Sequence, residues 1–435
     1  MRNPPESDKL AAKITTKNPM RLRLSGLAWL AAVLSLAGCA TPPPRTSPEP
    51  VSVLLISIDG LAASALGRGN TPHLDRLAAE GVRAQRMNPS YPVLTFPNHF
   101  TLVTGKRPDR HGMIHNSMRD ETLGRFRVAD LAAGADSRWW QAEPIWITAE
   151  KNGLAAATWA WPGNAAEIQG LRARRAVPYS PQVSPAERAD QVAGWLTEPV
   201  ATRPRLATLY FENVDTVGHD HGPGAAETQA TVREVDAAIG RILDALEAHR
   251  LRDRTDVLVV SDHGMAEVRM DQYIALEDMA TIEQAEPFST GQVIGFTPNP
   301  GHEAEAERRL LGRHRHSQCW RKQDLPPRWH YGQHPRVPAI ICQMDEGWNA
   351  LPAEQLQKLP VADRNRGSHG YDPALPSMGA MFVAAGPHFR KGAVLAPFDN
   401  VDVYPLLARL LEITPAPNDG SAQTFDAVLQ APAGR

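Results

Sequence analysis

The chain of 435 residues is poor in features that mark several classes of protein. It has only three cysteines, none with metal-ligand spacing to another, and its aromatic residues make up 6%. The formal net charge is -2 without a long basic or acidic block, so we expect no sequence-specific nucleic-acid binding. No internal repeat occurs, and 38 prolines fit a loop-rich soluble enzyme rather than a fibrous chain.

The N-terminal region lacks an apolar run that spans a bilayer comfortably, and it has instead the pattern of an export signal. Arg21 and Arg23 precede an apolar stretch at residues 24–37. This stretch ends in small residues, which is typical of a segment that is cleaved off. Residues 36–39 (Leu, Ala, Gly and Cys) resemble the lipobox of bacterial lipoproteins.

We therefore expect residues 1–39 to be a lipoprotein-type signal, with Met20 as an alternative start. Residues 40–50 are rich in proline and predict an extended tether. The expected product is an exported, periplasmic lipoprotein, held at a membrane by a lipid on Cys39. An ordinary secretory signal with a chance cysteine is the alternative.

Cys319 and Cys342 are the two cysteines outside this segment. In an exported protein these two cysteines can form a disulfide that closes one loop. Their positions in the sequence do not show that they lie close together, so free thiols are the alternative.

Unbroken apolar segments alternate with amphipathic ones along most of the chain. The clearest helix is expected at residues 225–250, where apolar side chains recur at helical spacing, with others at 74–80 and 401–411. This alternation predicts an α/β fold with a mostly parallel sheet flanked by helices on both faces. Residues 265–366 lack this alternation of apolar and amphipathic segments, so we expect an inserted smaller subdomain there. The expected boundaries are 51–264 and 367–425 for the catalytic domain and 265–366 for the insertion.

Aspartate and histidine recur directly after the apolar runs. A single such pair is usually a capping carboxylate beside a surface histidine, but here the arrangement repeats. The carboxyl ends of parallel strands meet at one edge of a sheet, so these side chains predict a binuclear metal centre. Zn²⁺ prefers imidazole and carboxylate where cysteine is absent. The candidate ligands are Asp59, Asp215, His219, Asp262, His263 and His369.

Thr95 lies between an apolar run and a proline-containing turn. A hydroxyl in that position usually caps a helix or is buried. Beside a metal ion the same hydroxyl would be a nucleophile that needs no side-chain base. His99 is expected to pack or to bond locally, and His221 points away from His219 at helical spacing, so it is not expected to be a ligand.

A Thr-Pro-x-Leu-Asp helix and a Thr-Phe-Pro-Asn-His turn are followed by Asp-His motifs and a late His-Gly-Tyr-Asp. With other segments between Val51 and about residue 420, they resemble, in order, the nucleotide pyrophosphatase/phosphodiesterase family of the alkaline phosphatase superfamily. The matching segments are 70–82, 95–99, 104–108, 111–116, 161–163, 215–223, 261–265, 369–372, 386–387 and 398–407.

The resemblance implies an alkaline phosphatase-like fold, two Zn²⁺ per chain and a phosphothreonyl intermediate on Thr95. It also implies that Asn116 binds a non-bridging phosphate oxygen. Leu94 departs from the family, in which a polar or basic residue is common. The implied ligand sets are Asp215, His219 and His369 for one zinc, and Asp59, Asp262, His263 and Thr95 for the other.

The resemblance favours a diester or pyrophosphate of a nucleotide as substrate, cleaved to a nucleoside monophosphate. Phe96 and Tyr179 correspond to aromatic residues that stack on a base, although each ring alone fits core packing equally well. Trp159, Trp161 and Tyr210 are further candidates for a substrate wall. The alternatives are a choline or lipid-headgroup phosphodiesterase and a surface lipoprotein that binds metal without catalysis. The oligomeric state does not follow from the sequence.

Overall fold

The computed structural model describes residues 49–431. The expected signal at residues 1–39, and all but the end of the expected tether at 40–50, lie outside the described residues. The described part contains one large sheet and several smaller ones. Within it, no helix is both long and apolar enough to cross a membrane.

The large sheet has eight strands, and five neighbouring ones are parallel as the sequence predicts. β19 is the exception, because it runs antiparallel to both β9 and β2 and makes the sheet mixed. In order across the sheet the strands are β20 (Ala393–Leu395), β2 (Val82–Ala84), β19 (Phe382–Ala385), β9 (Thr255–Val260), β1 (Ser52–Ile58), β8 (Leu206–Phe211), β6 (Ala156–Trp159) and β7 (Arg175–Val177).

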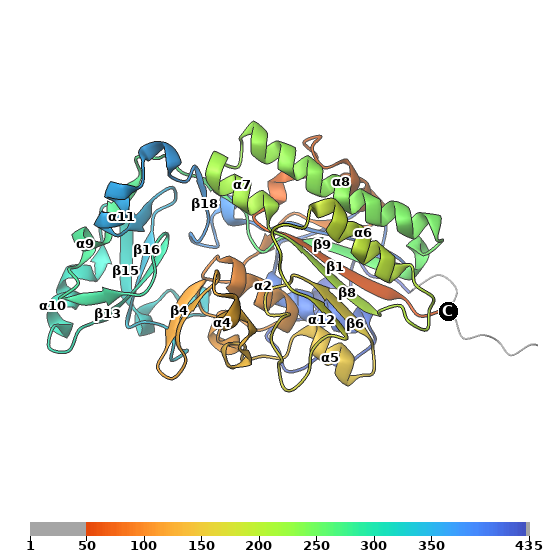
Figure 1. Ribbon diagram of the computed structural model, residues 1–435, viewed down its shortest axis with the longest axis horizontal. Helices are drawn as coiled ribbons and strands as arrows, with labels where there is room; N and C mark the ends of the chain where they lie inside the picture. Colours follow the sequence, from red (N-terminus) through yellow and green to blue (C-terminus); the bar gives the residue numbers. More distant parts are fainter. Residues whose placement is uncertain (1–48, 432–435) are drawn as a thin grey trace, which may run out of the picture. The chain divides into compact units, whose positions relative to one another are not determined.

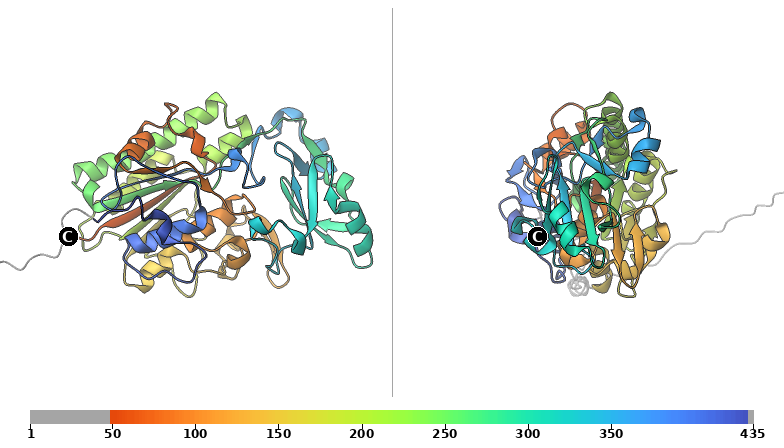
Figure 2. Two further views of the ribbon diagram at one scale, coloured as in Figure 1. Left: turned by 180° about the vertical axis from the view of Figure 1, so that it is seen from behind. Right: turned by 90° about the vertical axis from the view of Figure 1, so that its left-hand side faces the viewer.

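Helices cover both faces of this sheet, which explains why its central strands are apolar on both sides. Figures 1 and 2 show one layer of long helices on one face and a second layer on the other. The first layer contains α6 (Pro185–Leu196), α7 (Asn213–His221) and α8 (Ala226–Ala248), and the second contains α2 (Thr95–Thr104), α5 (Ile145–Lys151) and α12 (Val403–Leu410). The helices expected at residues 225–250 and 401–411 are therefore confirmed, as is the one at 74–80, which is α1 (Pro72–Glu80).

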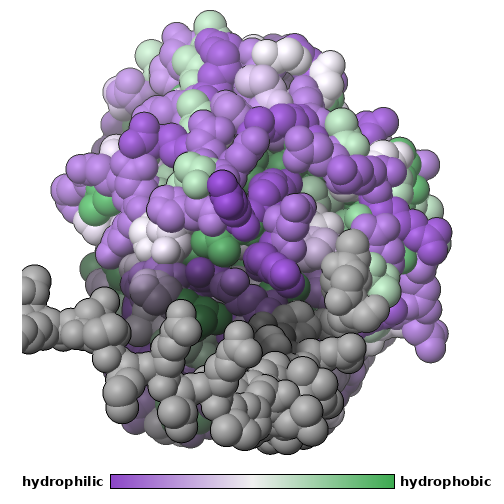
Figure 3. Space-filling model, turned by 90° about the vertical axis from the view of Figure 1, so that its right-hand side faces the viewer, coloured by the Kyte–Doolittle hydropathy of each residue, from purple (hydrophilic) through white to green (hydrophobic). Residues whose placement is uncertain are grey.

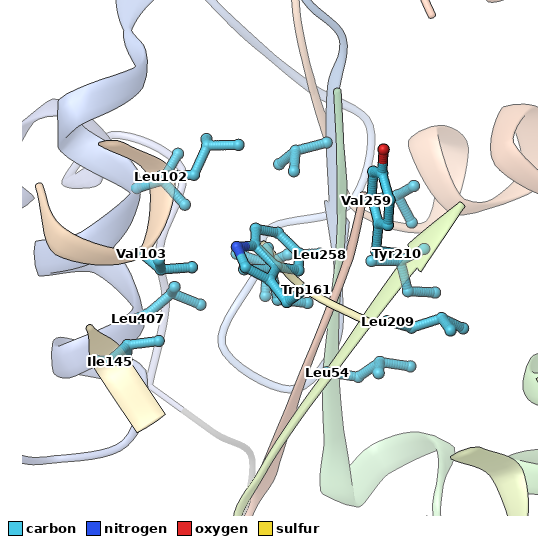
Figure 4. Packing of buried hydrophobic residues seen from close by; sticks show 14 of the residues in the cluster. Leu54, Leu102, Val103, Ile145, Trp161, Leu209, Tyr210, Leu258, Val259 and Leu407 are labelled. Atoms are coloured by element: carbon cyan, nitrogen blue, oxygen red, sulfur yellow. The ribbon is translucent and has the colours of Figure 1, made fainter. Parts of the chain in front are cut away.

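Trp161 joins the second helical layer to the sheet. Its ring lies between Leu102 and Leu407 on one side and strand residues such as Leu258 on the other (Figure 4). It is fully buried, and its indole N–H donates to the backbone oxygen of His99 at 3.1 Å. Trp159 is also buried, so both tryptophans belong to the core and neither forms the substrate wall considered above.

A second, five-stranded sheet is antiparallel throughout and lies within residues 285–344. It has a separate apolar cluster that includes Ile294 and Phe296. Cys319 and Cys342 face each other across two of its strands and form a disulfide, as one of the two sequence alternatives predicted. In order the strands are β12 (Ala285–Pro287), β13 (Val293–Pro298), β16 (Ile340–Met344), β15 (Ser317–Arg321) and β14 (Gly312–Arg313).

This second sheet lies within the stretch expected to be an insertion, although the exact domain boundaries stay a prediction. The segment between β15 and β16 contacts the main domain at Tyr331, whose hydroxyl donates to the Ile114 backbone oxygen at 3.1 Å. The surface visible in Figure 3, outside the grey atoms, is mostly hydrophilic with scattered apolar residues.

Candidate metal centre and active site

The six expected metal ligands meet at the carboxyl edge of the large sheet. Asp59 follows β1, Asp262 and His263 follow β9, and α7 after β8 carries Asp215 and His219. His369 comes from the loop after β18 (Gly367–Ser368), a short strand beside α7. Segments far apart in sequence thus supply one compact group because parallel strands bring their ends together.

Several ligand atoms face one another at short distances. The nearest carboxylate oxygen of Asp262 lies 2.8 Å from His263 Nε2, and that of Asp59 lies 3.6 Å from the same nitrogen. Asp215 is 3.5 Å from the Nε2 of both His219 and His369. One candidate cluster contains Asp215, His263 and His369, so His263 lies between the two ligand sets that the resemblance implies.

The backbone turn after β1 permits this approach. Gly60 has φ +72°, and a side chain there would come within 3.1 Å of the Asp215 carboxylate. A residue with a Cβ would therefore be strained in backbone and crowded against Asp215. The Asp-Gly sequence at this strand end is thus required by the close approach of two expected ligands.

All three candidate ligand histidines are held in the same way. Each places Nδ1 within hydrogen-bond distance of a backbone oxygen: His219 with Gly367 at 2.8 Å, His263 with Gly264 at 3.0 Å and His369 with Val93 at 2.9 Å. Since a carbonyl only accepts, Nδ1 is the donor in each contact, and in the neutral ring Nε2 is then the nitrogen with the lone pair. This is the tautomer that a metal ion bound at Nε2 requires.

Buried polar atoms without partners also concentrate here. Oδ1 of Asp59, Oδ1 of Asp215, Oδ2 of Asp262 and Nε2 of His263 accept or donate no hydrogen bond within the described residues. Asp262 and His263 illustrate the point, because their 2.8 Å approach lacks the angle of a hydrogen bond. Buried polar atoms are rarely left unpaired, so such a convergence fits a cation better than a closed hydrogen-bond network.

The electrostatics of the group point the same way. Burial raises the pKa of Asp59 well above its usual range, and the carboxylates of Asp262 and Asp215 raise it further. Burial and the charge of Asp215 likewise raise the pKa of Asp262. Burial, with His263 and His219 nearby, lowers the pKa of His369 well below its usual range. Carboxylates that repel one another beside the His369 imidazole would be stabilised by a bound divalent cation.

His99 approaches the same carboxylates, and with Asp59 and Asp262 it forms a second candidate cluster. Its ring nitrogens are already used, however: Nδ1 lies 2.9 Å from the Thr95 oxygen, and Nε2 lies 2.8 Å from the Ser57 hydroxyl. Burial lowers its pKa to about 3, which keeps the ring neutral. His99 therefore holds the backbone of Thr95 in place, consistent with the local bonding expected from the sequence.

Thr95 is the first residue of α2 and is 9% exposed. The helix N-terminus adds a partial positive charge, which favours a negatively charged oxygen there. Asn116 lies beside it, since its Oδ1 accepts a hydrogen bond from the Phe96 backbone N–H at 3.0 Å. This bond uses the amide oxygen of Asn116. The amide nitrogen, Nδ2, forms no hydrogen bond within the described residues. Thr95 and Asn116 are thus adjacent, as the resemblance implies.

The expected substrate-binding rings have different surroundings. Phe96 is half-buried and packs against Phe126 and Trp140, with ring centroids 5.8 and 6.0 Å away. Tyr179 is 37% exposed, and burial followed by the charge of Glu212 raises its pKa. No ring contact joins Phe96 to Tyr179 among the described residues, so base stacking between them stays a prediction.

Tyr210 has a contact that the sequence did not reveal. Its ring is buried, and its hydroxyl donates to Oδ2 of Asp59 at 2.5 Å. Figure 4 shows the hydroxyl at the edge of the core cluster. Tyr210 therefore orients an expected metal ligand, and the substrate contact assigned to it from the sequence remains untested.

Arg188 on α6 is a second residue without a sequence signal. Its guanidinium is fully buried and donates to Glu212 Oε1 at 2.7 Å, to the Tyr210 oxygen at 3.2 Å and to the Ser180 oxygen at 3.3 Å. It thus joins the segment that carries Tyr179 to the start of α7. An isolated arginine in an amphipathic helix gives no hint of this role, because its partners come from two other segments.

Known proteins share this arrangement of sequence and fold. The family model described as "Type I phosphodiesterase / nucleotide pyrophosphatase" matches residues 53–372. An uncharacterized pyrophosphatase/phosphodiesterase of Schizosaccharomyces pombe is 33% identical over 386 residues, which cover 85% of this chain and 79% of that one. A bis(5'-adenosyl)-triphosphatase of Xenopus laevis is 32% identical over 413 residues, covering 93% and 87%.

A solved structure and a longer relative complete the comparison. Murine ectonucleotide pyrophosphatase/phosphodiesterase 5, an inactive threonine-to-alanine variant in complex with AMP, has a TM-score of 0.82 and 31% identity, covering 87% of this chain and all of that one. The chain spans only 44% of the longer ectonucleotide pyrophosphatase/phosphodiesterase family member 3 of Bos taurus, at 33% identity. With the family model matched over most of its length, the chain belongs to the type I phosphodiesterase/nucleotide pyrophosphatase family.

Proposed function

We propose that this chain is a zinc-dependent phosphodiesterase that releases nucleoside monophosphates from nucleotide diesters and pyrophosphates. The observation that carries the proposal is the convergence of unpartnered carboxylate and imidazole atoms next to His99, whose ring bonds the Thr95 backbone. The donor set suits zinc, because it consists of imidazole nitrogens and carboxylates without cysteine. Two ions per chain are expected, with Asp215, His219 and His369 holding one and Asp59, Asp262 and His263 the other.

The chain's own residues define the chemistry. Thr95 Oγ loses its proton to solvent and attacks phosphorus, and the bond from phosphorus to the leaving oxygen breaks as that oxygen gains a proton from solvent. A water molecule then cleaves the Thr95–phosphate ester, restores the hydroxyl and releases the nucleoside monophosphate. Bound zinc would stabilise the charge on the phosphoryl oxygens and on the threonine oxygen.

The remaining residues position the reactants. Asn116 would donate from Nδ2 to a non-bridging oxygen of the phosphoryl group. His99 fixes the Thr95 backbone through its carbonyl, and Tyr210 fixes the Asp59 carboxylate. Two relatives support the proposed nucleophile and substrate class: the murine threonine-to-alanine variant is inactive and was solved with AMP, and the Xenopus laevis relative is a bis(5'-adenosyl)-triphosphatase.

A substrate panel on one metal-loaded preparation tests the proposal. A nitrophenyl ester of a nucleoside monophosphate and a dinucleoside polyphosphate should be cleaved, with glycerophosphocholine and a simple phosphate monoester far slower. Chelation should abolish the activity and Zn²⁺ should restore it, with about two ions per chain by metal analysis. Preferred cleavage of glycerophosphocholine would favour the lipid-headgroup alternative, and full metal content without any turnover would favour the metal-binding lipoprotein.

We also propose that the protein is exported in a bacterium and anchored through Cys39. The support is the order of charge, apolar stretch and lipobox at residues 21–39, which lie outside the described residues. Mass spectrometry of the mature N-terminus should find a lipidated Cys39, and Cys39→Ser should leave the protein uncleaved or in the aqueous phase. A mature protein that begins elsewhere and carries no lipid would contradict the anchor.

A further inference from the structure

The amino edge of the large sheet gathers basic side chains from segments that lie far apart in the sequence. We define this edge as residues 49–51, 199–205, 249–254 and 386–392, which precede β1, β8 and β9 and follow the antiparallel β19. It contains seven arginine and lysine residues and only two carboxylates. Because the whole chain has a net charge of -2, its composition does not explain this positive edge.

The four segments meet around the first described residue. The Arg203 guanidinium pairs with the Glu49 carboxylate, and the Arg254 guanidinium donates to the Glu49 backbone oxygen at 3.4 Å. The segment of residues 386–392 joins them at β9, where the His388 backbone N–H donates to the Asp256 carboxylate at 3.2 Å. The basic residues therefore belong to one continuous surface.

Several of these basic side chains have no carboxylate partner. Arg250, Arg390 and Lys391 are exposed, and none of them forms an ion pair with the described residues. Arg252 has a carboxylate partner from outside the edge, Glu80 at 3.3 Å. The amino edge thus presents excess positive charge to solvent, whereas the carboxyl edge of the same sheet holds the carboxylates of the candidate metal centre.

The expected lipid anchor connects to the described chain at this amino edge. Glu49 is ten residues after Cys39, and ten residues of extended backbone span at most about 35 Å. A lipid on Cys39 would therefore keep the amino edge within that distance of the membrane. β1 runs from this edge to the candidate metal centre, and its seven residues separate the two by about 20 Å.

We propose that the amino edge is a docking surface for anionic phospholipid, and that it holds the candidate active site away from the membrane. The inference rests on the proposed anchor at Cys39 and adds the surface that faces the lipid. Arginine and lysine side chains are attracted to an anionic bilayer within a Debye length of its surface. Figure 3 shows this end of the molecule, and the surface visible there is mostly hydrophilic, so the contact depends on charge rather than on apolar insertion.

Lysine labelling of the lipidated, metal-loaded protein tests the proposal. On vesicles of phosphatidylcholine and phosphatidylglycerol, an amine-reactive ester should label Lys391 at least about fivefold more slowly than on vesicles of phosphatidylcholine alone. That factor is what the attraction of one basic side chain to an anionic surface supplies. Lys358, which is exposed on α11 (Ala353–Lys358), should be labelled equally on both kinds of vesicle.

Charge removal tests whether the amino edge causes the difference. Arg250→Asn/Arg390→Gln should restore most of the Lys391 labelling on the anionic vesicles, and asparagine suits position 250 because φ there is +58°. Arg68→Gln/Arg308→Gln is the matched control and should behave like the wild type. It replaces two exposed arginines outside the amino edge that form no ion pair in the described part of the chain. Equal labelling of Lys391 in the wild type on both kinds of vesicle would overturn the proposal.

Mass spectrometry and nucleotide hydrolysis on the same preparation separate this inference from the proposed anchor and activity. If the mature protein carries no lipid but sediments with the anionic vesicles at low salt, and Arg250→Asn/Arg390→Gln does not, the anchor is wrong and the docking surface stands. If the protein is lipidated and Lys391 stays fully labelled on the anionic vesicles, the anchor stands and the docking surface is wrong. Hydrolysis should be the same in this double variant and in the wild type, because neither arginine lies near the candidate active site.

Discussion

Two groups of buried histidines use their ring nitrogens in opposite ways. In the group at the carboxyl edge of the large sheet, Nδ1 is bonded to a backbone oxygen. Nε2 lies near a carboxylate but forms no hydrogen bond with it. In the group around α2 and the start of β4 (Ser117–Asp120), both nitrogens are bonded within the chain. The first group is His219, His263 and His369, and the second is His99, His111 and His115.

The difference shows that burial alone does not identify a metal ligand. His99, His111 and His369 are all buried, and burial lowers the pKa of each. What separates them is whether the second nitrogen already has a partner. A histidine with both nitrogens bonded stabilises the fold, whereas one with a fixed proton on Nδ1 and a free Nε2 is preorganised for a metal ion.

Thr95, whose backbone oxygen bonds His99, should give the largest effect. Thr95→Ala removes the proposed nucleophile, so kcat/KM for a nucleotide diester should fall by several orders of magnitude. Metal content and melting temperature should remain near the wild-type values, because the His99 bond is to the Thr95 backbone. Thr231→Ala on α8 is the matched control, and near-normal turnover by Thr95→Ala would show that Thr95 is not the nucleophile.

Replacing one histidine from each group is the direct test of the comparison. His369→Gln should weaken metal binding and activity at least about a hundredfold, because it removes a candidate ligand rather than a supporting group. His111→Gln should keep full metal content, since its nitrogens bond Thr101 and Met113 instead. Chelator competition measures the affinity, and equal metal loss in both variants would break the distinction.

His99 tests the ambiguous case, because it also approaches Asp59 and Asp262. His99→Gln should retain metal but lower the free energy of unfolding by about 1–3 kcal/mol, since Ser57 and the Thr95 oxygen lose a buried partner. Urea denaturation and metal analysis on the same preparation give both quantities. Loss of one metal ion would instead place His99 among the ligands.

The packing histidines also predict a pH dependence. Burial lowers the pKa of His111 to about 3 and that of His115 to about 4. The unfolded chain therefore binds protons that the folded chain does not, and the free energy of unfolding should decrease as the pH falls from about 6.5 to about 4. Each histidine contributes up to about 1.4 kcal/mol per pH unit.

Urea denaturation at several pH values measures this slope. His111→Gln should make it shallower by the contribution of one proton, with the exposed His249→Gln as the matched control. An unchanged slope in His111→Gln would show that His111 does not resist protonation in the folded state.

His221 should give the smallest effect. It is exposed at the end of α7, two residues from His219, and none of the candidate clusters includes it. His221→Gln should change the free energy of unfolding by less than about 0.5 kcal/mol and leave metal content unchanged. A measurable loss of metal affinity would require a ligand outside the predicted set.

The strand-end residues were predictable because unbroken apolar runs identify buried parallel strands, and parallel strands end at a common edge. The same reasoning predicts from the sequence alone that Asp59, Asp262 and His263 lie near Asp215. The apolar pattern does not predict the direction of a strand, so the antiparallel orientation of β19 could not be foreseen. It also does not predict contacts between side chains of distant segments.

Other features depend on tertiary contacts that have no local pattern. The Tyr210 hydroxyl donates to Asp59 from the neighbouring strand, and Arg188 bonds partners from two other segments. The Cys319–Cys342 disulfide required the register of β15 and β16, which the sequence left open.

Anomalous diffraction at the zinc edge, from crystals of the zinc-loaded protein, tests the central claim most directly. The account predicts two peaks, with Nε2 of His219 and His369 about 2.1 Å from one and Nε2 of His263 about 2.1 Å from the other. Thr95 Oγ should lie next to the second peak. A single peak, a peak bound to His99, or zinc held away from Thr95 would contradict it.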